Sequence, residues 1–240
     1  MTYVMSDIHG NLQRFESILS QIKLQATDQL FILGDVVDRY PGGIKILRRI
    51  MKMPNVRMIL GNHEHMMLNA LGTPYDADYT PCEFAMATDM YLWHCNGGKV
   101  THKEFNKLDD HQQSEIISFL QTLPLYVDVT VNGVDYKLVH AAPAEEYVYD
   151  SDYENPTEFA VWKRWREPYG AHRDYRLIFG HSTTDHYQDI LPMEPWIGNN
   201  CIGIDCGSGY PESKYYRNTG RLACLRLDDG KVFYSEEIAA

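Results

Sequence analysis

The sequence predicts an α/β fold in which two β-sheets pack as a sandwich flanked by helices, and three patterns support this prediction. Short apolar runs alternate with helical patterns through the first 71 residues. Alternating apolar and polar residues flank Asn132-Gly133 and Asp229-Gly230, dipeptides that favour tight hairpin turns. Clusters of His, Asp and Asn follow the apolar runs. A chain of 240 residues can bury one large core, so we predict a single domain over residues 1–240.

Three strand–loop–helix units are predicted in succession at the start of the chain. Each apolar run leads into a polar loop and then into a segment with apolar residues at helical spacing. Right-handed crossovers make the consecutive strands of such units parallel, and sites in open α/β sheets are built at the carboxyl edge. We expect strands at 2–5, 29–33 and 56–60 and helices at 12–22, 44–51 and 66–71.

The rest of the chain is predicted to add a helical insertion and a second sheet. The periodicity weakens from about residue 72 to residue 123, and 111–120 has a helical pattern, so we predict a mainly helical insertion at about 72–123. The hairpin at 125–140 begins the second sheet. The apolar runs at 176–181 and 201–205 are further strands, and 221–237 is a second hairpin.

Composition excludes several classes of protein. The formal net charge of -11 argues against a general surface for nucleic acid or anionic membranes, because such a surface needs basic patches. The five cysteines include no C-x-x-C pair and follow no signal peptide, so a reduced, cytoplasmic location is expected. The sequence contains no run of 18 apolar residues, so no membrane span is predicted. The sequence leaves the oligomeric state open.

The polar endings of the strands suggest a metal site. They read "DIH", "GDVVDR", "GNHE", "LVHAA" and "FGHS", and each follows an apolar run. Taken singly, a Gly-Asp pair or a lone histidine is most often a turn or an ordinary polar residue. Taken together they supply imidazole nitrogen with carboxylate and amide oxygen, a mixed set that suits manganese, iron or zinc, whereas calcium and magnesium prefer oxygen.

In this order the motifs resemble those of the calcineurin-like metallophosphoesterases, and within them the phosphoprotein phosphatases, in particular the compact bacterial and phage branch. The matching segments are "SDIHG" (6–10), "GDVVDRY" (34–40), "GNHE" (61–64), "VHAA" (139–142) and "GHST" (180–183). They span residues 6–183, which is most of the chain. The resemblance therefore implies the two-sheet, helix-flanked fold of that family, with its site at the carboxyl ends of the strands.

The resemblance also implies a dinuclear metal centre. Two divalent transition-metal ions are expected, manganese first and iron or zinc as alternatives, with a hydroxide bridging them as the nucleophile. Chemistry supports such a pair, because two cations about 3.5 to 4 Å apart stabilise both the attacking and the leaving oxygen. By matching position, Asp7 and His9 bind one ion, Asp35 bridges both, and Asn62, His140 and His181 complete the second site.

The same resemblance implies a proton donor and groups that bind phosphate. His63 of "GNHE" is the expected general acid for the leaving oxygen, and Asp38 orients it. Arg39, together with Asn62, is expected to contact the phosphate, since a guanidinium group matches phosphate oxygens. Glu64 is expected to be a first-turn residue favoured by the positive end of a helix rather than a catalytic base.

A second phosphate-binding arginine is expected in "VWKRWRE". The resemblance favours Arg164 over Arg166. The alternative, of equal weight, is a helix that packs Trp162 and Trp165 in the core and leaves its basic residues in solvent.

Three departures from the family pattern affect the substrate. Leu60 stands where many protein phosphatases have an arginine, and Thr183 stands where many other metallophosphoesterases have a further metal-binding histidine. The second departure favours the phosphoprotein phosphatase branch. The loop at 208–221 is long, and its cations could bind a second phosphate or simply be solvated: Lys214, Arg217 and Arg221.

Three functions follow from these observations. The first is hydrolysis of phosphate monoesters as a serine/threonine protein phosphatase, with a phosphorylated protein or a small phosphoester as substrate. The second is hydrolysis of a dinucleoside polyphosphate such as diadenosine tetraphosphate, which Leu60, the tyrosines of 144–155 and the basic loop 214–221 make credible. The third is a metal-binding adaptor without turnover. No nucleic acid or membrane partner is expected.

Overall fold

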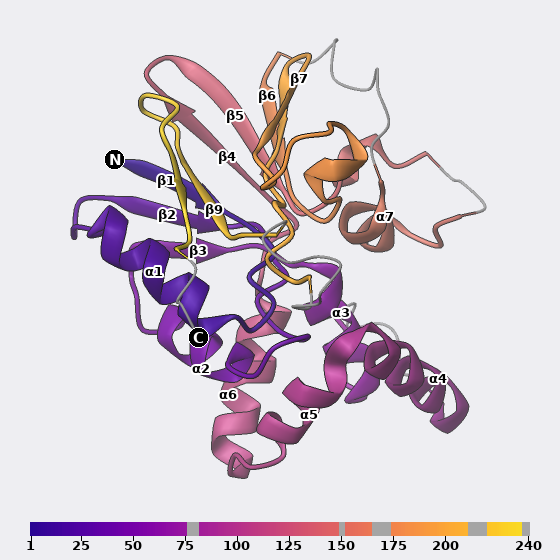
Figure 1. The fold of residues 1–240 in the computed structure, drawn as a ribbon. Helices are drawn as coiled ribbons and strands as arrows, with labels where there is room; N and C mark the ends of the chain where they lie inside the picture. Colours follow the sequence, from indigo (N-terminus) through magenta and orange to yellow (C-terminus); the bar gives the residue numbers. More distant parts are fainter. Residues whose placement is uncertain (76–81, 149–151, 165–173, 211–219, 237–240) are drawn as a thin grey trace.

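The described part of the chain forms two five-stranded sheets that pack face to face, with helices on both outer sides (Figure 1). The structure is a computed structural model and describes residues 1–75, 82–148, 152–164, 174–210 and 220–236. This architecture confirms the predicted two-sheet α/β fold.

The first sheet combines the three predicted parallel strands with the C-terminal hairpin. Strands β1, β2 and β3 are parallel neighbours, and β9 pairs antiparallel with β1. The hairpin turns near Gly230, whose φ is +74°. The last hairpin therefore returns to the first sheet. In sheet order the strands are β10 (Val232–Tyr234), β9 (Ala223–Arg226), β1 (Thr2–Met5), β2 (Gln29–Ile32) and β3 (Val56–Met58).

The second sheet begins with the hairpin predicted at Asn132-Gly133. Both turn residues have positive φ, 50° and 77°, as a two-residue type I′ turn requires. Strands β5, β6 and β8 are parallel, and the antiparallel strands β4 and β7 form the edges. In sheet order the strands are β4 (Tyr126–Val131), β5 (Val134–Val139), β6 (Arg176–Phe179), β8 (Cys201–Gly203) and β7 (Trp196–Gly198).

Burial on both faces explains why the first strands are continuous apolar runs. In β1, Tyr3 and Met5 face the helices, whereas Val4 belongs to the core between the sheets. The same alternation continues after β2, where Leu33 joins the inter-sheet core. Figure 1 shows α1, α2 and α6 on one side of the first sheet and the second sheet on the other.

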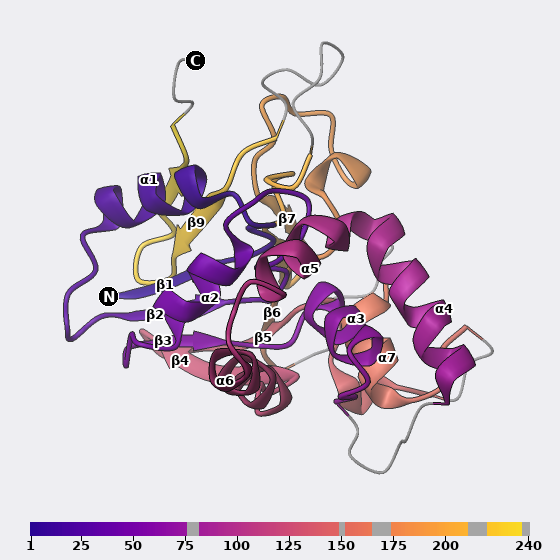
Figure 2. The same cartoon turned by 90° about the horizontal axis from the view of Figure 1, so that it is seen from below.

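Helices cover the outer faces and fill the segment predicted as an insertion. The segment at 72–123 contains α4, α5 and α6, and a turn that is kinked at Gly97, whose φ is +100°, joins α4 to α5 (Figure 2). The α-helices are α1 (Leu12–Ile22), α2 (Gly43–Ile50), α3 (Asn62–Ala70), α4 (Glu83–Trp93), α5 (Lys99–Phe105), α6 (Asp110–Gln121) and α7 (Pro156–Trp162). The short helical turns are η1 (His94–Gly98), η2 (Ala144–Glu146) and η3 (Thr184–His186).

The two sets of parallel strands bring their carboxyl ends to one central region. Strands β1, β2 and β3 approach it from the first sheet, and β5, β6 and β8 approach it from the second (Figure 1). Residues that are far apart in sequence are therefore neighbours there. None of the helices in the described ranges is both long and apolar enough to cross a membrane. No disulfide joins the five cysteines, all of which lie in the described part of the chain, and three of them are buried.

Asp28 joins the first residue of the chain to the turn before β2. Its carboxylate accepts hydrogen bonds from the Met1 ammonium group at 2.7 Å and from the backbone N–H of Gln25 at 2.9 Å. These hydrogen bonds lower the pKa of Asp28 from its ordinary value of 3.8. A carboxyl group whose pKa is lower in the folded state stabilises the fold above its unfolded pKa, and this contribution disappears as the pH falls through the folded pKa.

We therefore expect Asp28→Asn to lower the free energy of unfolding at pH 7 by about 1 kcal/mol. The difference from wild type should shrink as the pH falls below 3.8, where the wild-type carboxyl group takes up a proton. Urea unfolding at neutral and acidic pH measures both values. Asp189→Asn, at an exposed residue, makes the same charge change and is the control. Equal stability of Asp28→Asn and wild type at pH 7 would contradict the prediction.

Candidate active site

The polar residues that follow the parallel strands form one buried cluster. They belong to the loops after β1, β2 and β3 of the first sheet and after β5 and β6 of the second. None of the six metal ligands expected from the sequence is more than 8% exposed. The structure brings all six together: Asp7, His9, Asp35, Asn62, His140 and His181.

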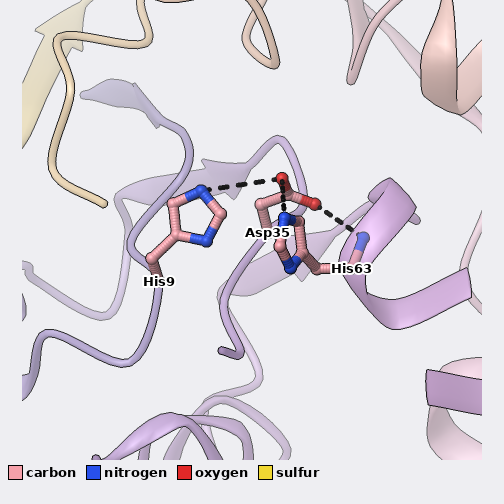
Figure 3. A group of neighbouring side chains, drawn as sticks. All are labelled: His9, Asp35 and His63. Carbon is pink, nitrogen blue, oxygen red and sulfur yellow. Dashed lines mark hydrogen bonds and ion pairs between the residues drawn. The ribbon is translucent and has the colours of Figure 1, made fainter. Parts of the chain in front are cut away.

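Asp35 lies at the centre of this cluster (Figure 3). Its Oδ2 atom is 3.7 Å from Nε2 of His9 and 3.8 Å from Nε2 of His63. Its Oδ1 atom is 3.5 Å from Nε2 of His140 and accepts a hydrogen bond from the backbone N–H of His63 at 3.0 Å. The two oxygens of one carboxylate therefore face two different sets of nitrogen atoms, as a bridging ligand would.

Two groups of side chains offer donor atoms that all lie within 4.8 Å of one another. One group is His9, Asp35 and His63, and the other is Asp35, His140 and His181. The first group includes His63 where the sequence analysis expects Asp7. Asp7 is nevertheless close, because its Oδ1 atom is 3.8 Å from Nε2 of His9.

Donor atoms converge on the second group, which is what a cation site requires. Nδ1 of His140 lies 2.6 Å from the Leu33 carbonyl oxygen and donates to it, which leaves Nε2 as the ring atom that faces the cluster. That Nε2 atom lies 2.9 Å from Oδ1 of Asn62. His181 uses Nε2 to donate to the Trp162 carbonyl at 3.1 Å, and its Nδ1 lies 3.0 Å from the same Asn62 oxygen.

His9 has the same arrangement on the other side of the cluster. Its Nδ1 faces the Val37 carbonyl at 3.3 Å, which leaves the Nε2 lone pair for the carboxylates of Asp7 and Asp35. Burial first, and then the charge of Arg39, lowers the pKa of His9 well below its ordinary value. Lone pairs that face one another repel, and a cation between them would remove this repulsion. The mixed nitrogen and oxygen donors therefore fit divalent transition-metal ions.

Carboxyl groups repel one another in the same cluster. Burial, and then the charge of Asp35, raises the pKa of Asp7. Burial, and then the charge of Asp7, raises the pKa of Asp205 well above its ordinary value. The sequence analysis missed Asp205, although it follows the apolar run of β8 as the other acids follow theirs. A bound cation would relieve this repulsion, because opposite charge favours the ionised carboxylate.

His63 and Asp38 form a buried pair beside Asp35. Nδ1 of His63 lies 2.7 Å from Oδ2 of Asp38, and both side chains are essentially inaccessible to solvent. Burial lowers the pKa of His63, but the carboxylates of Asp35 and Asp38 outweigh burial and leave this pKa raised. The charged form of the imidazole is therefore favoured, as a proton donor needs.

The helical insertion holds Asp38 in place, a contact that the sequence analysis did not foresee. Trp93 at the end of α4 donates its indole N–H to Oδ1 and Oδ2 of Asp38 at 3.1 and 2.9 Å. Thr101 of α5 accepts a hydrogen bond from the Asp38 backbone N–H at 2.9 Å. Trp93 is fully buried and lies against Gly98, where an added Cβ would be 2.4 Å from the indole.

Arg39 lies next to this pair. One guanidinium nitrogen is 3.4 Å from Nε2 of His63, and the Arg39 backbone N–H donates to the Gly97 carbonyl at 3.2 Å. The predicted phosphate-binding arginine and the predicted proton donor are thus adjacent.

Left-handed backbone conformations are concentrated at the site. Nine non-glycine residues in the described part of the chain have positive φ, and six of them are site residues. Such a conformation costs roughly 1–2 kcal/mol per residue in an L-amino acid, so the surrounding structure must impose it. The six residues are Asp7, His9, Asp35, Asp38, Arg39 and His181.

Glu64 has a larger role than the expected favourable position in a first helical turn. It is completely buried, and its carboxylate accepts backbone N–H groups from Gly61, Asp35, Val36 and Val37 at 2.8 to 3.2 Å. One side chain therefore joins the loop after β3 to the loop after β2.

The other predicted phosphate contacts differ in position. Arg164 is exposed, and its Nη1 lies 3.4 Å from the Ser182 hydroxyl beside His181. Leu60 is fully buried in the core between sheet and helices, so that position faces no substrate. Arg221 donates hydrogen bonds to the Met193 carbonyl and to the carboxylate of Glu194. The remaining candidates, Arg166, Lys214 and Arg217, lie outside the described residues, as does Trp165 of the alternative helix.

Comparison with known proteins identifies relatives for nearly the whole chain. The family model described as calcineurin-like phosphoesterase matches residues 2–203. Serine/threonine-protein phosphatase 2 of Escherichia coli (strain K12) is 29% identical over 94% of this chain and 92% of its own length. A symmetrical bis(5'-nucleosyl)-tetraphosphatase of Salmonella paratyphi A is 38% identical over 97% of this chain and 93% of its own length.

The fold has solved counterparts. The crystal structure of a metallophosphoesterase from Sphaerobacter thermophilus aligns with a TM-score of 0.52 at 17% identity, over 98% of this chain and 87% of that one. At this identity the likeness shows the fold.

The indole N–H of Trp93 yields a test of how the buried Asp38 is held. We expect Trp93→Phe to lower the free energy of unfolding by about 1–3 kcal/mol, because a buried carboxylate loses a hydrogen-bond donor. Urea unfolding measures the change. Trp196→Phe, which alters a half-buried tryptophan stacked on Tyr187, controls for the loss of ring volume. If both variants lose the same stability, the Asp38 hydrogen bond contributes nothing specific.

Proposed function

Because this chain belongs to the calcineurin-like phosphoesterase family and is a metal-dependent phosphatase, we propose that it hydrolyses phosphate monoesters, with phosphorylated serine or threonine in proteins as the substrate. The observation that carries this proposal is the position of Asp35, which faces two sets of imidazole nitrogens while the His63–Asp38 pair and Arg39 lie beside it. We further propose cytoplasmic action and two manganese ions.

Six residues would hold the metal ions in this proposal. When bound, divalent cations polarise the phosphoryl oxygens and lower the pKa of water towards neutrality. Asp35 would contact both ions, and the other ligands would be divided between them as their positions in the structure suggest. Asp7 and His9 would bind on one side, and Asn62, His140 and His181 on the other.

The protein's own groups would then bind the substrate and move a proton. Arg39 would bind phosphate oxygens through its planar guanidinium group, with Asn62 and Arg164 as further contacts. Nε2 of His63 would donate its proton to the leaving oxygen, while Nδ1 keeps its hydrogen bond to Asp38. Trp93 would position Asp38, and so the imidazole, without touching the substrate.

A dinucleoside polyphosphate is the second candidate substrate. The tetraphosphatase relative at 38% identity and the buried Leu60, which leaves no arginine at that position, favour it. The tyrosines of 144–155, which could stack a base, favour it less, because Tyr147 and Tyr153 both pack edge-on against Phe159 of α7. An adaptor without turnover is set aside, because the family and its relatives are phosphatases and hydrolases.

Two substitutions test the proposed roles. With Mn(II) present, Asp35→Asn should lower turnover of p-nitrophenyl phosphate at least about a hundredfold, because a shared ligand of both ions loses its charge. His63→Gln should lower kcat by about 10²- to 10⁴-fold on a phosphothreonine peptide, whose alkoxide leaving group needs a proton. The loss should be much smaller on p-nitrophenyl phosphate, whose leaving group does not.

The difference between the two substrates separates proton donation from structural damage. An equal loss on both would show that His63 is not the general acid, and full activity of Asp35→Asn would remove the proposed centre. His111→Gln, at an exposed side chain on α6, is the matched control and should leave both rates unchanged.

A substrate panel decides between the two candidate substrates. We expect kcat/KM to be highest for the phosphothreonine peptide among that peptide, p-nitrophenyl phosphate, bis-p-nitrophenyl phosphate and diadenosine tetraphosphate. Asp35→Asn should abolish every activity that depends on the proposed metal centre. A preference for the dinucleotide that Asp35→Asn removes would favour the second candidate over the first.

A further inference from the structure

A basic groove between α2 and the segment after α5 has no role in the proposed chemistry. The groove has a volume of about 640 Å³, and α2 and α5 lie next to each other in Figure 2. Ile44 and Leu108 contribute apolar surface to it. Five cations line it, although the chain as a whole carries a net charge of -11: Lys45, Arg48, Arg49, Lys52 and Lys107.

Four cations of α2 and its C-terminal extension lie on one side of the helix. Lys45 precedes Arg48 and Arg49 by three and four residues, and Lys52 follows them by four and three residues, which is the spacing of neighbours on a helix surface. Like charges at these spacings destabilise a helix. The helix dipole favours cations in the last turn, which accounts for the two arginines, but it opposes Lys45 in the first turn. Local helix stability therefore does not explain this stripe.

Most of these charges have no ion-pair partner in the part of the chain that the structure describes. Arg49 pairs with Glu16. Among the described residues, no carboxylate forms an ion pair with Lys45, Arg48, Lys52 or Lys107. The one acid that lines the groove is Glu104, and its Oε2 accepts the backbone N–H of Gly42 at 3.3 Å. Within the described residues the groove therefore has an excess of positive charge.

We propose that this groove binds an acidic segment of another polypeptide. The cations of α2 and its C-terminal extension lie within the eight residues from Lys45 to Lys52, about 10 Å along the helix axis, which matches three to four residues of an extended peptide. Lys45, Arg49, Lys52 and Lys107 are exposed on long, flexible side chains and do not enclose the groove. Such an arrangement suits several weak contacts along a flexible acidic chain better than one small anion. The apolar surface of Ile44 and Leu108 can accept side-chain carbon between the charges.

The groove also lies close to the proposed catalytic loop. The backbone N–H of Gly42 donates a hydrogen bond to Glu104 at the groove, and Gly42 follows Arg39 by three residues. On the other wall, α5 follows the turn whose Gly97 carbonyl accepts the Arg39 backbone N–H. An acidic segment in the groove could therefore belong to a protein that is also bound at the active site. The long polyanionic surface of a nucleic acid would extend beyond the groove onto an acidic protein, and is disfavoured.

Fluorescence anisotropy of a labelled ten-residue glutamate peptide with the full chain tests this proposal. Wild type should bind the peptide, and added salt should weaken binding, since the groove is open to solvent. The variant K45E/K52E should bind at least tenfold more weakly. R57E/K231E makes the same change in net charge at exposed residues outside the groove and should bind within twofold of wild type. Circular dichroism and thermal unfolding of each variant show that it is folded.

Three outcomes would overturn the proposal: unchanged binding in K45E/K52E, an equal loss in R57E/K231E, or binding of inorganic polyphosphate or single-stranded nucleic acid without binding of the glutamate peptide. A kinetic comparison, which rests on the proposed function, extends the test. KM for a phosphothreonine peptide with glutamate flanks should rise in K45E/K52E, whereas turnover of p-nitrophenyl phosphate should not change. Because the binding assay needs no turnover, an error in the proposed activity cannot be mistaken for the absence of the groove's ligand.

Discussion

The buried carboxylate of Glu64 is the interaction on which the geometry of this site depends. It accepts backbone N–H groups from both the loop after β2 and the start of α3, so it fixes Asp35 relative to Asn62 and His63. The loops can approach because Gly34 has no side chain: at its φ of +83°, an added Cβ would lie 2.6 Å from the Gly61 Cα atom. One acid and one close backbone contact thus set the distances between the two halves of the proposed centre.

The same loops hold the strained backbone of the site in its left-handed conformations. The loop after β1 continues the hydrogen bonding of the sheet, because the backbone N–H groups of Asp7, His9 and Gly10 donate to carbonyls of the loop after β2. These hydrogen bonds hold residues in left-handed conformations that would be unfavourable in an isolated loop. Preorganisation of this kind places donor atoms before a metal or substrate arrives, so less ordering remains to be done when the ligand binds.

The helical insertion is part of this support and more than a cover. Trp93 and Thr101 bind Asp38, and Gly97 binds the backbone of Arg39, so α4, η1 and α5 fix the loop that carries the proposed catalytic residues. The walls of the basic groove are built from α2, which follows that loop, and from the segment after α5. A partner bound in the groove would contact α2, which begins four residues after Arg39, and the segment after α5.

The sequence alone determined where the polar residues of the site would meet. Apolar runs of strand length lead into Asp7, Asp35, Asn62, His140 and His181. Parallel strands bring their carboxyl ends, and so these residues, to one edge. The two hairpins were equally predictable, because Asn-Gly and Asp-Gly turns are local features. Their effects depend only on neighbours in the chain.

Only the tertiary structure decided which distant groups touch. The contact of Trp93 with Asp38 joins residues 55 positions apart, and no local pattern encodes it. Asp205 follows its strand like the other acids, but its repulsion with Asp7 arises only because the second sheet packs against the first. The last hairpin pairs with β1 for the same reason. Which strands pair depends on burial of a shared core, and the local pattern of apolar residues cannot specify that choice.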